Sequence, residues 1–176
     1  NQTAQQAQRE AHWWQTVIEL AKSAGVKITV LDLAAMHLAR PHVRPDLWGI
    51  WKPILEKAAR YGFPLNYHAY THPTAPYNMR YEAKEVVARW IYWVREIPNL
   101  KILCGEWGAG NWNTQINHHD IAMFMGMIRE WDKIVEESGL RGSLIGAAAF
   151  TLGTTEDWQR FDFSSSLADY ERYMRG

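Results

Sequence analysis

Residues 100–106 read Leu100-Lys101-Ile102-Leu103-Cys104-Gly105-Glu106, a short apolar run that ends in a carboxylate. Pro98-Asn99 turns the chain just before this run, and a loop rich in Gly, Asn and Trp follows it at 107–117. Such a run between turn signals is typical of a strand buried on both faces of a parallel sheet. Three more segments of this kind are predicted as strands, at 26–33, 63–68 and 143–150.

Segments with helical spacing of apolar residues surround these strands. We expect helices over 4–24, 79–96, 119–138 and 165–175, and another that Asp46 caps and Tyr61 ends. Pro53 should kink or split that helix. The strands begin near residues 26, 63, 100 and 143, so their spacings are 37, 37 and 43 residues. Near-constant βα units predict an α/β fold with a parallel sheet.

The loops of this pattern are asymmetric. Those after the strands are long and aromatic, whereas the connections after the helices are short, as in a (β/α)8 barrel. No Gly-x-Gly-x-x-Gly or Walker-type loop follows a strand, so a nucleotide-binding doubly wound sheet is not favoured. A whole barrel needs eight units and about 250 residues. We therefore expect strands 5–8, the C-terminal half of a TIM barrel, as one partial domain over 1–176 with no internal linker.

Charge and composition exclude several classes of protein. Lys and Arg number 19 and Asp and Glu number 19, so the formal net charge is zero, and we expect neither nucleic-acid nor basic membrane-surface binding. No apolar run approaches the roughly 18 residues of a membrane span. The first residues lack a signal-peptide pattern, and an extracellular location stays open. We expect no cofactor and no metal site, because Cys104 is the single cysteine and no His and carboxylate side chains cluster.

The aromatic content is high, with ten Trp, eight Tyr and five Phe. Flat aromatic faces are surfaces against which sugar rings stack. Trp90, Trp93 and Trp131 lie on predicted helix faces, where we expect packing. Trp107, Trp112 and Trp158 fall in predicted βα loops. These three are candidates for sugar-binding platforms or walls, with packing inside the loops as the open alternative.

Polar side chains at the predicted strand ends carry the functional signal. Asn66, His68 and Tyr70 share one face by strand parity. Ile102, Cys104 and Glu106 share a face of the next strand, with Glu106 at its last inward position, and Asp32 holds the corresponding place in the first strand. Carboxylates beside aromatic faces are what glycoside hydrolysis requires. A structural carboxylate at Glu106 and a hydrogen-bonded structural His68 remain the alternatives.

Two short motifs resemble a known family. Asn66-Tyr67-His68-Ala69-Tyr70 and Leu103-Cys104-Gly105-Glu106-Trp107-Gly108 are similar to the sixth and seventh strand ends of clan A glycoside hydrolases, the cellulase- and mannanase-like barrels. The resemblance implies that Glu106 is the nucleophile of a retaining mechanism. It also implies that His68 and Tyr70 orient Glu106 and touch an oligo- or polysaccharide substrate.

The chain departs from this family at two places. Phe150-Thr151-Leu152 stands where the family has a Trp at the end of the eighth strand, and Trp158 comes later. The acid/base Glu of the family follows an Asn at the end of the fourth strand. We expect that residue upstream of residue 1, where Asn1-Gln2-Thr3 does not match the motif.

Two other functions stay open. One is a non-catalytic carbohydrate-binding or assembly protein with a barrel-derived fold. The weaker one is a metal-dependent sugar isomerase or amidohydrolase, which would need more converging His and Asp. In each case half a barrel leaves two unpaired sheet edges and an apolar inner face, with Ile28, Val30, Ile102 and Ala147 as expected members. We therefore expect a complementary N-terminal half, from the same longer chain or from a partner chain.

Overall fold

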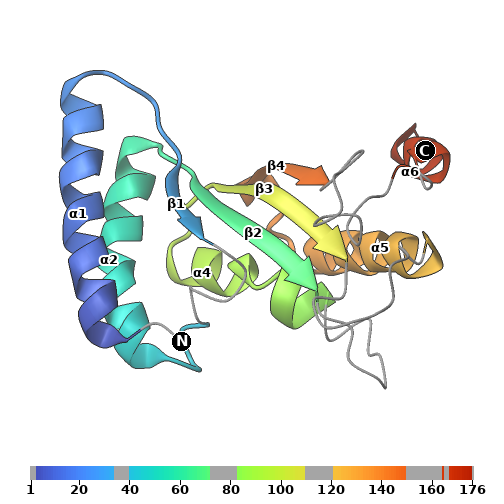
Figure 1. The fold of residues 1–176 in the computed structure, drawn as a ribbon, viewed down its shortest axis with the longest axis horizontal. Helices are drawn as coiled ribbons and strands as arrows, with labels where there is room; N and C mark the ends of the chain where they lie inside the picture. The colour runs from blue at the N-terminus through green and yellow to red at the C-terminus, as the bar shows by residue number, and fades with distance from the viewer. Residues whose placement is uncertain are drawn as a thin grey trace. The chain divides into compact units, whose positions relative to one another are not determined.

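The structure, a computed structural model, describes residues 3–33, 40–71, 83–109, 121–149, 164 and 167–175. Helices and strands alternate along these ranges (Figure 1). Their order is α1 (Ala4–Ser23), β1 (Val30–Leu33), α2 (Pro45–Tyr61), β2 (Leu65–Thr71), η1 (Ala83–Val87), α4 (Trp90–Glu96), β3 (Ile102–Ala109), α5 (Ile121–Ser138), η2 (Arg141–Ser143), β4 (Leu144–Ala149) and α6 (Leu167–Arg175). The predicted α/β class is confirmed.

The four strands form one parallel sheet in the order β1-β2-β3-β4 (Figure 1). Each strand lies beside the one that follows it in the sequence. The described sheet therefore has no point at which the strand order reverses, which is the feature that places ligands in doubly wound sheets. The prediction of parallel βα units is confirmed.

Strand β1 is shorter than predicted and contains an extra residue. Pairing begins only at Val30, whose N–H donates to the carbonyl of Pro64 at 2.8 Å, so the prediction of a strand over 26–29 is wrong. Val30 then pairs with Leu65, and Asp32 pairs with Asn66. The chain thus advances two residues along β1 while it advances one residue along β2. Leu31 is the extra residue, buried and at a φ of 54°. This is a β-bulge with a left-handed residue.

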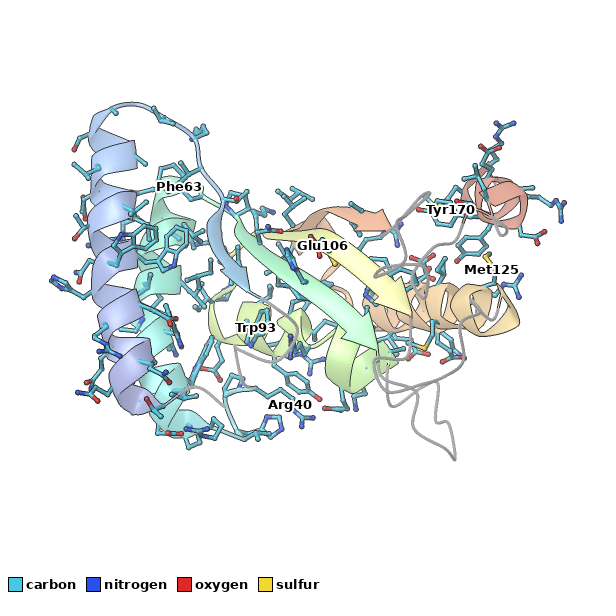
Figure 2. All side chains as sticks on the ribbon, in the orientation of Figure 1. Arg40, Phe63, Trp93, Glu106, Met125 and Tyr170 are labelled. Carbon is cyan, nitrogen blue, oxygen red and sulfur yellow. The ribbon has the colours of Figure 1, made fainter. Side chains whose placement is uncertain are left out.

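The chain divides into two compact units. The first comprises Asn1–His68, Arg89–Gly105 and Leu140–Ala147, and the second comprises Ala69–Ala88, Glu106–Gly139 and Ala148–Gly176. In the first unit α1 packs along α2 (Figure 1). The ring of Trp93 on α4, labelled in Figure 2, meets the ring of Tyr67 on β2 edge to face, with ring centroids 5.7 Å apart. Trp90 and Trp93 are fully buried, so their predicted packing role is confirmed.

Helix α2 runs unbroken through Pro53, so the helix is not split there, and the kink stays a prediction. The ring of Pro53 removes the hydrogen bond to the carbonyl of Gly49. Gly49 is exposed, and water can therefore serve that carbonyl. The cap position belongs to Arg44, with Pro45 as the first helical residue, so Asp46 is not the cap. Asp46 lies in the first turn and pairs with Arg44 at 2.7 Å.

The helix predicted over 79–96 is two elements in the described part of the chain. η1 is a π-helix in which the Ala88 N–H donates to the carbonyl of Ala83, five residues earlier. α4 begins afresh at Trp90. The continuous prediction is wrong because the apolar spacing continues across two elements that belong to different units. In its own unit η1 packs against α5.

The second unit is built around α5. Met127, Ile128 and Val135 of this helix are buried. Tyr173 of α6 donates its hydroxyl hydrogen bond to Asp132 of α5, so α6 is tied to α5. The predicted helices over 119–138 and 165–175 are confirmed within two residues. No helix in the described ranges has the length and apolarity needed to cross a membrane.

Candidate functional site

A side chain of β2 holds the backbone of β3 directly before Glu106. The N–H of Gly105 donates to Oδ1 of Asn66 at 2.9 Å. A Cβ at residue 105 would lie 2.4 Å from that oxygen and 2.9 Å from the Asn66 amide nitrogen. Real Cβ atoms essentially never approach so closely, so only glycine fits here without movement. Asn66 and Gly105 thus fix the backbone of β3 one residue before the candidate nucleophile, and we call this contact the Asn66–Gly105 lock.

The two faces of the strands differ from the expected ones. Tyr67 and Cys104 are both fully buried, and burial, followed by the adjacent Cys104 thiol, raises the pKa of Tyr67 well above 10. Cys104 therefore lies on the Tyr67 face, whereas Asn66 and His68 alternate onto the opposite, half-buried face. The expectation that Ile102 and Cys104 share an inner face with Asn66 is wrong. Spacing defines the two faces but does not tell which one the helices cover.

The other residues expected on the inner face differ in how far they are buried. Val30 and Ile102 are fully buried, Ile28 is half-buried and Ala147 is exposed. Cys104 is a free, buried thiol.

The burial pattern of β3 changes period at Glu106. Ile102 and Cys104 are buried, then Gly105 and Glu106 are both half-buried, and Trp107 is buried again. The alternation of buried and half-buried residues is therefore interrupted at Glu106, which is more exposed than Ile102 and Cys104. β3 continues three residues past Glu106, to Ala109 (Figure 2).

Trp107 lies inside β3 and not in the loop where we expected it. Its side chain is 3% exposed, and its ring lies 6.1 Å from that of Trp131 on α5. Trp131, at 9% exposure, packs as predicted. Trp107 therefore offers almost no surface to a sugar ring and serves the packing of the second unit.

The remaining candidates are placed less completely. Asp32 pairs with Asn66 across the first two strands, and Tyr70 is the sixth residue of β2; their side chains are outside what the structure describes. Trp112 and Trp158 lie outside the described residues. Among described residues, no group of three or more His, Cys, Asp or Glu side chains could hold a metal ion.

A buried arginine is the residue that we missed from the sequence. Arg89 is 7% exposed, its guanidinium lies 5.8 Å from the Trp93 ring, and Nε and Nη2 have no hydrogen-bond partner in the described part. Burial lowers the pKa of Arg89 to about 10; the nearby Tyr67 opposes this lowering, and the Arg40 charge adds to it. The sequence could have indicated this burial, because Arg89 lies four residues before Trp93 and therefore on the same predicted apolar helix face.

Comparison with protein-family models, with characterised proteins and with solved structures finds no match to this chain. The roles of these side chains therefore have to be proposed from their own chemistry and surroundings. That chemistry is a half-buried carboxylate directly after a glycine whose backbone N–H donates to Asn66 of the neighbouring strand.

Proposed function

We propose that the chain is the nucleophile-bearing part of a retaining glycoside hydrolase that acts on an oligo- or polysaccharide. The observation that carries this proposal is the lock between Asn66 and Gly105, which fixes the backbone directly before Glu106. An active-site carboxylate needs such support, because reaction rates are sensitive to sub-ångström placement of the reacting groups. The half-buried position of Glu106 supports the same role, since a substrate has to reach it.

In the proposed reaction a carboxylate oxygen of Glu106 attacks the anomeric carbon of the sugar. The bond from that carbon to the leaving oxygen breaks, and a second carboxylate about 5 Å away protonates the departing oxygen. The same second carboxylate then removes a proton from water, which attacks the anomeric carbon and releases Glu106. His68 and Tyr70 orient the Glu106 carboxylate, and Asp32, Trp112 and Trp158 contact the sugar in this proposal.

The second carboxylate comes, in this proposal, from a complementary N-terminal half of a TIM barrel. The unbroken strand order supports it, because consecutive strands of a barrel are neighbours throughout. Closure would also satisfy the free edges of β1 and β4. Analytical ultracentrifugation of the 176-residue chain tests this point. A compact monomer that melts cooperatively without a partner would mean that the sheet is complete as an open α/β sheet.

The decisive test of the nucleophile is substitution in the complete protein, whether one longer polypeptide or two associated halves. Glu106→Ala should lower turnover of an aryl glycoside by about a thousandfold or more. Added azide should restore part of the cleavage and give the glycosyl azide of inverted configuration, because the vacated space admits a small anion. Glu56→Gln, an exposed change on α2, is the matched control and should keep full activity.

Unchanged turnover in Glu106→Ala would remove this residue from the mechanism. A wild-type protein that binds oligosaccharide but never cleaves it would instead favour the non-catalytic carbohydrate-binding alternative. Loss of turnover without azide rescue, together with loss of ligand binding, would assign Glu106 to the structure and not to the reaction.

A further inference from the structure

A hollow of about 400 Å³ lies in the first unit and is lined by none of the candidate residues around Glu106. Its size is within the range of small-ligand pockets, about 300–1,000 Å³. The lining comes from the segment before α2, from α2 and from α4: Pro41, His42, Trp48, Tyr92, Arg95 and Glu96. All of these residues belong to the first unit.

The charges around the hollow leave one cation uncompensated. Glu96 is paired with Lys52, with 2.9 Å between its Oε2 atom and the lysine nitrogen. Arg95 is exposed and has no hydrogen bond or ion pair with any residue in the described ranges. The local balance is therefore positive. A guanidinium is the side chain best suited to bind a carboxylate through two parallel hydrogen bonds.

The other walls are aromatic and include an unused donor. The rings of His42 and Tyr92 meet edge to face, with centroids 5.1 Å apart and an interplanar angle of 63°. Trp48 is only 7% exposed, and its Nε1–H has no hydrogen-bond partner among the described residues. A buried donor without an acceptor is unfavourable, so an oxygen atom brought in by a ligand relieves that cost.

We propose that this hollow binds a small ring-bearing carboxylate. The carboxylate pairs with Arg95, the ring lies against His42 and Tyr92, and a ligand oxygen accepts from Trp48 Nε1 after a small side-chain adjustment. Two sources supply this chemistry, a uronic acid unit of a polysaccharide and an aromatic acid. The site does not depend on the proposed glycosidase activity, because none of its residues takes part in that reaction.

The test is titration of the full chain, followed by NMR, with glucuronate and benzoate and with their neutral counterparts glucose and benzyl alcohol. At least one acid should bind saturably with a Kd of about 1 mM, as expected for ligands of this size. It should bind about tenfold tighter than its neutral counterpart and weaken when salt rises to about 0.5 M. Binding of benzoate alone identifies an aromatic acid, and binding of glucuronate alone identifies a uronate.

Two variants assign the contacts. Arg95→Gln should weaken the acid about tenfold while the neutral counterpart is unaffected. Trp48→Phe keeps a buried ring but removes the donor, and should weaken the acid several-fold. Arg60→Gln, an exposed change at the far end of α2, is the control and should leave the affinity unchanged. The proposal is overturned if neither acid saturates, if acid and neutral ligands bind equally, or if Arg95→Gln keeps the wild-type affinity. If Trp48→Phe fails to fold, the affinity of Arg95→Gln for the acid still tests the proposal.

Discussion

Replacing Gly105 with alanine tests the lock that holds the backbone before Glu106. The new Cβ would lie 2.4 Å from Oδ1 of Asn66, about 1 Å inside ordinary contact, so either the side chain or the strand must move. Overpacking of this kind costs about 1–3 kcal/mol. Movement of Asn66 also breaks its 2.9 Å hydrogen bond with the Gly105 N–H, which contributes about 0.5–1.5 kcal/mol. We expect Gly105→Ala to lower the free energy of unfolding by about 1.5–4.5 kcal/mol.

A double variant, Gly105→Ala with Asn66→Ala, separates the clash with Asn66 from any other cost of alanine at residue 105. Asn66→Ala alone should cost about 1–3 kcal/mol, because it leaves a backbone N–H of β3 without its acceptor. Asn66→Ala also empties the space that the new Cβ needs. Gly105→Ala with Asn66→Ala should therefore cost about 1–2 kcal/mol less than the sum of the single changes.

Equilibrium unfolding in urea, followed by tryptophan fluorescence and far-UV circular dichroism at one fixed protein concentration, measures all three variants. A Gly105→Ala protein within about 0.5 kcal/mol of wild type, or strictly additive costs, would show that Asn66 does not confine this backbone.

Three further changes test the buried side chains. Burial lowers the pKa of Arg89 to about 10, which corresponds to an unfavourable burial on the order of 3 kcal/mol. The contact of its guanidinium with a tryptophan ring offsets about 1–2 kcal/mol of this cost. Arg89→Met should therefore raise the free energy of unfolding at pH 7 by about 1–2 kcal/mol, with exposed Arg9→Met as a nearly neutral control. A less stable Arg89→Met would contradict this reasoning. The pKa of Tyr67 is raised in the folded state, so its contribution to the free energy of unfolding is complete below pH 10 and is lost as the pH rises beyond it. Urea unfolding between pH 8 and 11 should therefore show a steeper alkaline loss of stability in wild type than in Tyr67→Phe. Parallel stability curves for the two proteins would contradict this prediction. Trp107→Ala should cost about 3–5 kcal/mol, as a buried packing residue does, and a thermal melt unchanged from wild type would make Trp107 a surface residue after all.

The sequence predicts the regular part of the fold well, because that part depends on local chemistry. Gly25, Gly62 and Gly139 follow the ends of helices, and all three have positive φ angles of 67°, 71° and 69°. Such angles are cheap only for glycine, so the signal is local and reliable. The spacing of the strands likewise predicts neighbouring parallel strands, since a right-handed βα unit returns the chain beside the strand it left.

The surroundings of Glu106 could be predicted only in part. Long-range packing decides which face of β3 the helices cover, and the alternation of side chains along the strand does not predict it. The bulge at Leu31 shifts the alternation of β1 by one residue, so a count of inward positions beyond it changes face. In β3 the alternation of burial is interrupted at Glu106. Trp107 was assigned to a loop because its neighbours are glycine-rich, whereas its burial against Trp131 is decided by the tertiary fold.

The bulge in β1 also bears on how this chain resists aggregation. β1 is an edge strand of four residues, and the left-handed Leu31 makes its row of backbone donors and acceptors irregular, which disfavours the regular repeated pairing of amyloid-like stacking. Natural proteins protect edges with such short, irregular strands. β4, at the other edge, has six residues and an Ile145 side chain that is 58% exposed. Self-association into fibrils should therefore start from β4, and a lysine gatekeeper placed there, as in Ile145→Lys, should suppress it while leaving the β1 edge as it is.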